Sequence, residues 1–173
     1  MATSKPAPSG KPVASTPKIV AENGKDALHK TIQARISERA YALYEGSGRE
    51  HGNAERHWHQ AEGEILQQGL EVRESGSWLS VSASLPDLSA EDMEICVEPE
   101  RVIVHAQKRQ VSEDKASQTQ ELIQTELFLA RSLPVEVEPS TASAAFKDQK
   151  LTLMVKKRYP ESAKDTPSAR AAS

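Results

Sequence analysis

Apolar and polar residues alternate along the chain between Gly76 and Arg158, with the period of two expected of β-strands that have one buried face. The stretch WLSVSASLPD shows the pattern most clearly, because serines separate its apolar residues. The alternating apolar positions are Leu79, Val81, Ala83 and Leu85; Met93, Ile95 and Val97; Val102, Val104 and Ala106; Leu127, Leu129 and Leu133; Ala142, Ala144 and Phe146; and Leu151, Leu153 and Val155. Such strands predict an all-β, immunoglobulin-like antiparallel sandwich over residues 76–158. The polar stretch 110–121 is expected to be a loop.

A helical period precedes the strands and predicts a two-helix hairpin over residues 31–68. We expect the first helix to end near Gly46 and the second to begin after Asn53, a common N-cap residue. The expected apolar stripes are Ile32, Ile36, Ala40, Leu43 and Tyr44 in the first helix and Ala54, Trp58, Ala61 and Ile65 in the second. The two stripes bury each other or lie together on the sandwich, and the sequence leaves both arrangements open.

The two ends of the chain are too polar to belong to a core. Residues 1–30 are rich in Pro, Ser, Ala and Lys, and residues 159–173 have a similar composition. Such segments bury too little apolar surface to offset the entropy lost on ordering. We therefore expect both ends to be disordered tails.

The charge and the apolar content restrict the partners. The net charge is −3 and the pI is near 6.0, whereas nucleic acids and anionic membranes attract strongly basic surfaces. No apolar run approaches the roughly 20 residues that cross a bilayer. Cys96 is the single cysteine and forms no intramolecular disulfide, which fits a reducing compartment. We predict no nucleic-acid partner, no membrane partner and a cytoplasmic location.

The histidines of REHGNAERHWHQAEGEIL are the densest candidate ligands for a metal ion. Two ligands on one helix stand three or four residues apart, but His57 and His59 are two apart, roughly 200° around the helix. We therefore expect both histidines to be solvated. Trp58 is expected to point inward between them, toward Tyr41 and Tyr44, and to fix the hairpin.

Cys96 and the serines are poor candidates for catalytic nucleophiles. Cys96 is out of phase with the apolar residues beside it, so we expect it half-buried on the other face of the sheet. Glu94 and Glu98 would raise the pKa of its thiol and keep it unreactive. The serines of SVSAS have no histidine placed to activate them. The sequence predicts no catalytic residue, no cofactor and no metal site.

Three stretches resemble the small heat-shock protein family, whose shared module is the α-crystallin domain. LSVSASLPDLSAEDMEICVEPERVIVHAQKR is similar to the family's first strands, with Leu85-Pro86 at the turn, and ELFLARSLPVEV resembles a long strand that ends in Leu133-Pro134. ASAAFKDQKLTLMVKK resembles the A-x-x-x-N-G-V-L-x-I signature, with Ala144, Leu151 and Leu153 at the matching positions. The resemblance covers about half of the chain and implies an alpha-crystallin-type sandwich.

The chain departs from the family's pattern in four places. Gln149 replaces the signature glycine, so we expect a turn wider than a two-residue hairpin. Arg131 stands two positions after the place of the family's strand arginine, on the same strand face. The tail after Lys157 lacks the I-x-I or I-x-V motif that docks into a neighbour's edge groove. The stretch 110–121 is short for the loop that exchanges a strand between bacterial and plant members. We predict a homodimer and no large oligomer.

The resemblance implies an ATP-independent chaperone, a holdase that binds unfolding client proteins and is not an enzyme. We expect clients at the edge groove left vacant by the missing tail motif, lined by Met93, Ile95, Val97, Ala142, Ala144 and Phe146. The alternative is a non-chaperone interaction module or co-chaperone adaptor with the same sandwich, which the short loop and the missing motif favour. A monomer in solution would indicate the adaptor. An enzyme or metal protein built on the hairpin is a third, weaker hypothesis.

The helical hairpin has a resemblance of its own, to a short bacterial domain family of unknown function. That family's pattern is I-x-x-R-A-Y-x-x-Y, a glycine-containing loop and a helix with Trp and Ala-Glu. The matching residues are Ile36, Arg39, Ala40, Tyr41, Tyr44, Gly52, Trp58, Ala61 and Glu62. This resemblance implies a bacterial source and no particular activity.

Overall fold

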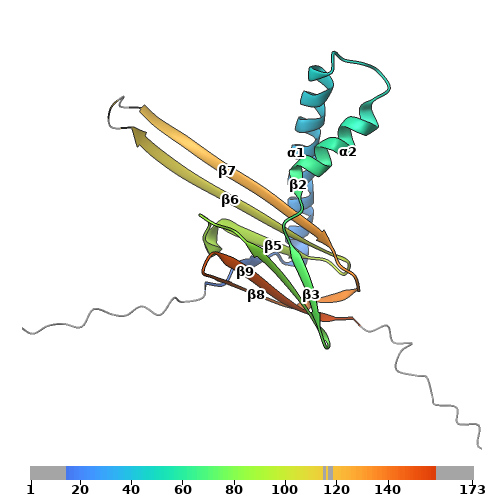
Figure 1. Ribbon diagram of the computed structural model, residues 1–173, viewed down its shortest axis with the longest axis vertical. Helices are drawn as coiled ribbons and strands as arrows, with labels where there is room; N and C mark the ends of the chain where they lie inside the picture. Colours follow the sequence, from blue (N-terminus) through green and yellow to red (C-terminus); the bar gives the residue numbers. More distant parts are fainter. Residues whose placement is uncertain (1–14, 115, 117–118, 159–173) are drawn as a thin grey trace, which may run out of the picture.

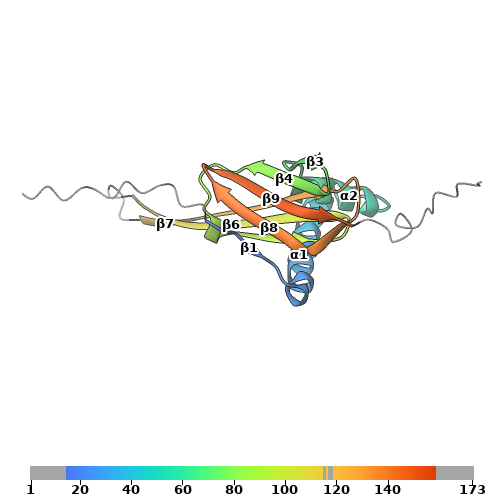
Figure 2. The ribbon, with the colours of Figure 1, turned by 90° about the horizontal axis from the view of Figure 1, so that it is seen from below.

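Two β-sheets packed face to face form the body of the protein, and a pair of helices lies against one of them (Figures 1 and 2). The computed structural model describes residues 15–158 except 115, 117 and 118. One sheet has the strand order β1-β5-β6-β7-β2 and the other the order β3-β4-β9-β8. The elements are β1 (Lys18–Ile19), α1 (Glu22–Gly46), α2 (Ala54–Ile65), β2 (Leu66–Gln67), β3 (Glu71–Ser75), β4 (Trp78–Ser84), a 3-10 turn (Ala90–Asp92), β5 (Met93–Val97), β6 (Arg101–Asp114), β7 (Thr119–Ser132), β8 (Val137–Lys147) and β9 (Lys150–Lys157).

The main core lies between the two sheets and is made by the alternating apolar residues of the sequence pattern. Leu79, Ile95 and Val155 are completely buried there, each on a different strand. All the alternating apolar residues predicted for the six strand stretches belong to this cluster or pack against it. Burying each large apolar side chain stabilises the fold by roughly 1.5–3 kcal/mol. The predicted sandwich is confirmed.

A second apolar cluster lies on the outer face of β5, β6 and β7, where helix α1 covers the sheet. Its helical part is Leu28, Ile32, Ile36 and Ala61, and its sheet part is Cys96, Ile103 and Phe128. The stripe predicted for the first helix is thus buried against the sandwich, with Ala40 and Leu43 partly buried beside it. The two arrangements that the sequence left open are therefore both present, because α1 contacts the sheet and α2 packs on α1 and closes the same cluster.

The ordered part of the chain begins earlier than the predicted disordered tail allows. Residues 15–20 run along the edges of both sheets, and α1 begins at Glu22 rather than at Thr31. Leu28 is the reason that the helix extends so far, because it continues the buried stripe toward the N-terminus. The prediction for residues 1–30 is therefore wrong from Ser15 onward. Residues 1–14 and 159–173 lie outside the described residues.

The buried face of α2 differs from the predicted one. His57 is only 4% exposed, whereas Trp58 is 37% exposed and Tyr41 60% exposed. The ring of His57 contacts that of Tyr44 edge to face, with 6.4 Å between the ring centroids. A helix turns by about 100° per residue, so a stripe through His57, Ala61 and Ile65 excludes Trp58. The predicted inward Trp58 and solvated His57 are both wrong. Tyr44, which is half-buried, does pack in the hairpin.

The predicted polar loop at 110–121 is mostly strand. β6 and β7 pair without a register shift from Arg101–Ser132 to Asp114–Thr119. The two strands therefore project beyond the sandwich as a long hairpin, which Figure 1 shows clearly. We call residues 109–114 and 119–124 of this hairpin the extension. The cross-strand ladder pairs the backbone groups that β6 and β7 turn toward each other, and the missing apolar alternation reflects the absence of a sheet above this polar segment.

The turn at Gln149 is as tight as a β-hairpin allows. Lys147 pairs with Lys150, so the turn consists of Asp148 and Gln149, with φ angles of 51° and 61°. Positive φ at both residues is typical of a type I′ turn, which suits the twist of a hairpin. The predicted wider turn is therefore wrong. The chain adopts the turn with two residues other than glycine, at a cost in backbone strain.

Candidate functional site

The candidate site is the groove between the edge strands β5 and β8, and residues 15–20 fill it. Lys18 and Ile19 of β1 pair in parallel with Glu94 and Ile95 of β5, and the Val20 amide donates a hydrogen bond to the Ile95 carbonyl at 2.8 Å. On the other side, the backbones of Ser15 and Phe146 exchange two hydrogen bonds of 2.8 and 3.1 Å. The segment therefore joins one edge of each sheet. We call residues 15–20 the edge segment.

The side chains predicted to line this groove are covered. Met93, Ile95 and Val97 are almost completely buried, as are Ala144 and Phe146, and Ala142 is partly buried. Ile19 packs against the same core cluster, and Pro17 and Val20 are buried. The edge segment thus lies between β5 and β8, where the sequence predicted a vacant groove. A cavity of about 300 Å³ remains beside it, lined in part by Ile19, Val97 and Ala142.

The edge segment and the helices form one strap across the five-stranded sheet. β1 pairs with β5 at one edge of this sheet, and β2 pairs with β7 at the other, through Leu66–Phe128 and Gln67–Leu129. The helices lie between these two attachments, over the outer face (Figure 1). Both ends of the strap therefore add a short parallel strand to the sandwich, and its middle buries an apolar stripe.

Hydrogen bonds between polar and charged side chains connect α1 of the strap to the sheet. Arg35 of α1 donates to Glu126 of β7 over 2.7 Å, and this hydrogen bond raises the pKa of the arginine. Glu126 also lies 3.1 Å from Nε2 of His105, whose ring stacks on Phe128 with 4.5 Å between centroids. At the other end of α1, His29 and Glu98 are 2.6 Å apart.

Cys96 lies beneath α1 on the outer sheet face, opposite to the side of Met93 and Ile95, as predicted. The thiol is fully buried rather than half-buried, because the helix covers it. Burial raises the pKa of this thiol, and the carboxylate of Glu98 raises it further. A thiol of raised pKa and no solvent access is a poor nucleophile.

The extension carries three of the seven exposed large apolar side chains among the described residues. Val111 and Leu122 are each 61% exposed, and Ile123 is 45% exposed. Val111 and Leu122 stand opposite each other in the ladder, so their side chains share one face, and Ile123 projects from the other face. Among the described residues, the outer edge of β7 is paired only at Phe128 and Leu129, by β2. The extension therefore presents apolar side chains and an open strand edge together.

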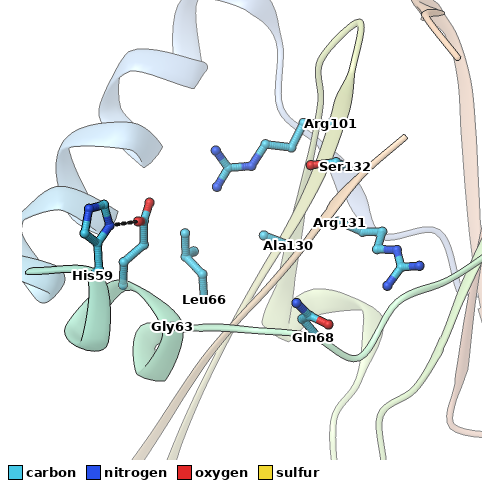
Figure 3. A pocket seen from close by; sticks show the side chains of 9 residues that line it. His59, Gly63, Leu66, Gln68, Arg101, Ala130, Arg131 and Ser132 are labelled. Atoms are coloured by element: carbon cyan, nitrogen blue, oxygen red, sulfur yellow. Dashed lines mark ion pairs between the residues drawn. The ribbon is translucent and has the colours of Figure 1, made fainter. Parts of the chain in front are cut away.

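A cavity of about 630 Å³ lies between α2 and the ends of β6 and β7 (Figure 3). His59 faces Glu62 across 3.8 Å at one side of it, and Arg101 and Arg131 extend from the strands. The two guanidinium groups point in different directions, so they do not converge on one anion (Figure 3). His59 is exposed, as predicted. No group of three metal-ligating side chains is present in the part of the chain that the structure describes.

The family-signature residues lie in β8, in β9 and directly after the end of β7. Leu133 is partly buried against the core, and its amide donates to the Glu100 carbonyl at 2.7 Å, while Pro134 is exposed. Ala144, Leu151 and Leu153 are buried, with Ala144 paired to Leu153 across β8 and β9. Leu133, Ala144, Leu151 and Leu153 are structural, since each packs in or against the core.

The family model for Hsp20/alpha crystallin matches residues 71–169, more than half of the chain. The chain belongs to the Hsp20/alpha crystallin family. A second family model, for proteins of unknown function (DUF2934), matches residues 33–67, which span most of the helical hairpin. Both resemblances inferred from the sequence are confirmed. In this member of the family, the matched hairpin lies on the sandwich itself.

Solved structures of other small heat-shock proteins are similar at low identity. The rat alpha crystallin domain is 21% identical, with a TM-score of 0.40, covering 53% of this chain and 91% of that one. Heat shock protein 16.0 from Schizosaccharomyces pombe is 16% identical, with a TM-score of 0.45, covering 61% of this chain and 84% of that one. A small heat-shock protein from Xylella fastidiosa is 15% identical, with a TM-score of 0.42 and coverages of 56% and 90%. No curated protein matches the chain.

The sequence pattern missed the edge segment. Pro17, Ile19 and Val20 lie in a polar stretch, and a two-residue strand is too short to show a period. The available signal was the cluster of apolar residues in PKIVA just before Glu22, a favourable residue for the first turn of a helix. No helix in the described ranges is long and apolar enough to cross a membrane.

Proposed function

We propose that the protein is an ATP-independent chaperone of the holdase type, which binds unfolding client proteins and prevents their aggregation. The observation that carries the proposal is the extension, where Val111, Leu122 and Ile123 stay exposed on a strand pair of an Hsp20-family sandwich. The exposed apolar side chains of this strand pair suit an apolar segment of a client. The proposed location is the cytoplasm, which suits the free Cys96 thiol.

The proposal is tested by heating a model client with and without the protein and following light scattering. We expect the full chain to suppress scattering at stoichiometric amounts, and a variant with Val111→Ser, Leu122→Ser and Ile123→Ser to suppress it less. The matched control carries Gln110→Ser and Gln124→Ser, two exposed residues of the same extension. No suppression by the full chain would refute the holdase function, and equal losses in both variants would refute the role of the apolar side chains.

We further propose that the protein is a homodimer that pairs through the outer edge of β7. The edge from Glu121 to Leu127 meets no strand among the described residues. Two copies related by a twofold axis can pair such edges as an antiparallel ladder, because the same surface then serves both subunits.

The molar mass in solution, measured by light scattering after size-exclusion chromatography, tests this proposal. We expect twice the chain mass of 18.9 kDa. A monomer that also fails to suppress aggregation would favour the alternative, a protein-interaction module or co-chaperone adaptor built on the same sandwich.

A further inference from the structure

His57 of α2 is buried in the helical hairpin with one ring nitrogen unpaired. The residue is 4% exposed, and its Nδ1 atom is buried without a hydrogen-bond partner among the described residues. Its ring lies edge to face against that of Tyr44, which in turn contacts the ring of His51, also with 6.4 Å between the centroids. A histidine cation carries an N–H group on both ring nitrogens, whereas the neutral ring carries only one. Protonation of His57 would therefore bury an unpaired N–H group together with a positive charge.

The carboxylates of the hairpin are engaged with other groups. Residues 37–65 contain six acidic side chains, all glutamates, and each has a partner other than His57. The partners are Arg35 for Glu38, Arg49 for Glu45, Asn53 for Glu50, His59 for both Glu55 and Glu62, and Arg39 for Glu64. Tyr44 and His51 bring no negative charge near neutral pH, and Arg56, the neighbour of His57 in the sequence, is positive. A charge on His57 would therefore be buried without a counter-ion, which costs free energy.

We propose that His57 makes the hairpin sensitive to acid, so that protonation of this side chain releases α2 from α1, and β2 from the edge of β7 with it. β2 begins directly after α2 ends, and it holds β7 only through the pairs Leu66–Phe128 and Gln67–Leu129. A contact this short opens far more readily than the body of a sheet. Its loss would leave the outer edge of β7 open at Phe128 and Leu129 as well. This regulation goes beyond the proposed holdase function and does not depend on it.

Helix α1 stays on the sheet in the same pH range. Its apolar stripe is buried against the outer face of β5, β6 and β7. His29 of α1 lies 2.6 Å from Glu98, and Glu126, which accepts a hydrogen bond from Arg35 of α1, lies 3.1 Å from His105. A protonated imidazole attracts a carboxylate, so acid strengthens the contacts of these two histidines while it weakens that of His57.

The protonation of His57 is coupled to the release of α2. The closed hairpin holds His57 in the neutral form, whereas the released helix exposes the ring and lets it take up a proton, which an exposed histidine does at about pH 6.5. The released state therefore binds more protons than the closed state below this pH, and acid shifts the equilibrium toward release. For one such group, the ratio of released to closed hairpin rises about tenfold between pH 7.5 and pH 5.5.

Hydrogen exchange of the full-length protein, followed by mass spectrometry, measures this ratio for the backbone amides of α2. After correction for the intrinsic exchange rate at each pH, we expect the opening constant of residues 54–65 to rise about tenfold from pH 7.5 to pH 5.5. In His57→Phe, which keeps a ring but takes up no proton, we expect a change of less than about twofold. The matched control is His59→Gln, an exposed position of the same helix, which should retain the tenfold rise.

Three results would overturn the inference. The first is an opening constant of α2 that is the same at both pH values in the unmodified protein, and the second is a rise of the same size in His57→Phe. The third is an equal opening constant in α2 and β9 at pH 5.5, because the whole sandwich would then unfold with the helix. If His57→Phe does not fold, His57→Leu replaces it, since leucine also takes up no proton and is apolar. No client enters these measurements, so a failed aggregation assay would refute the holdase function and leave this inference intact.

Discussion

The docking of the helical hairpin on the sandwich makes a quantitative prediction for Ile36. This side chain is 3% exposed and lies in the outer cluster with Ile103 and Phe128. Truncating a buried isoleucine to alanine removes its transfer free energy and leaves a cavity, at a cost of about 2–5 kcal/mol. We therefore expect Ile36→Ala to lower the free energy of unfolding by about 3 kcal/mol. For a domain of this size, the melting temperature should fall by roughly 6–12 °C.

The assay must report on the sandwich rather than on the helices. The chain has two tryptophans, Trp58 in α2 and Trp78 in β4. In a Trp58→Phe background, the fluorescence of Trp78 follows the unfolding of the sandwich alone. If hairpin and sandwich unfold as one unit, Ile36→Ala shifts the urea midpoint of Trp78 fluorescence as much as that of the helical circular dichroism.

The control is Ser37→Ala, the next residue along α1, which is exposed. Alanine has a higher helix propensity than serine, so this variant should be unchanged or more stable by a few tenths of a kcal/mol. A shift in the helical signal without a shift in the Trp78 midpoint would show that the hairpin unfolds separately. That result would refute the packing argument, since a helix that covers the sheet cannot lose contacts without destabilising it.

Three further predictions follow from individual residues. Gln149→Gly should raise the free energy of unfolding, measured by urea denaturation, by about 0.5–1 kcal/mol, because glycine tolerates the φ of 61°. The control Gln149→Ala should give no gain in this free energy. Cys96 should react with a thiol reagent at pH 8 only in denaturant, and rapid reaction of the folded protein would contradict the burial beneath α1. The hydrogen bond from Arg39 lowers the pKa of Glu64. This pair therefore stabilises the hairpin at pH values above the ordinary glutamate pKa. Its contribution is lost as the pH falls through the lowered pKa of Glu64. Arg39→Ala should remove that pH dependence from the melting temperature, and an unchanged profile would refute the assignment.

The sandwich was predictable because its signal is local and repeated. Residues such as Leu79, Val81 and Ala83 alternate on one strand, and each strand of the core repeats the rule. The first helical stripe was predictable for the same reason, since Ile32 and Ile36 recur at the helical period. In both cases the spacing of the apolar residues shows which face of the element is buried, whatever packs against that face.

The predictions that failed depended on a partner far away in the sequence. Whether His57 or Trp58 faces inward is decided by contact with α1, because both positions are compatible with a stripe through Ala61 and Ile65. The extension carries no apolar alternation because no second sheet covers it, so its polar sequence resembled a loop.

The sequence by itself determined the class of the sandwich, the family and the apolar stripe of the first helix, because period and spacing act between residues that are close along the chain. Only the tertiary structure decided that this stripe covers the outer face of the sheet and that residues 15–20 fill the edge groove. The pairing of Lys18 and Ile19 with Glu94 and Ile95 uses backbone groups, which every residue carries and no sequence pattern marks. Their position follows from the path of α1, whose buried stripe brings residues 15–20 to that edge of the sheet.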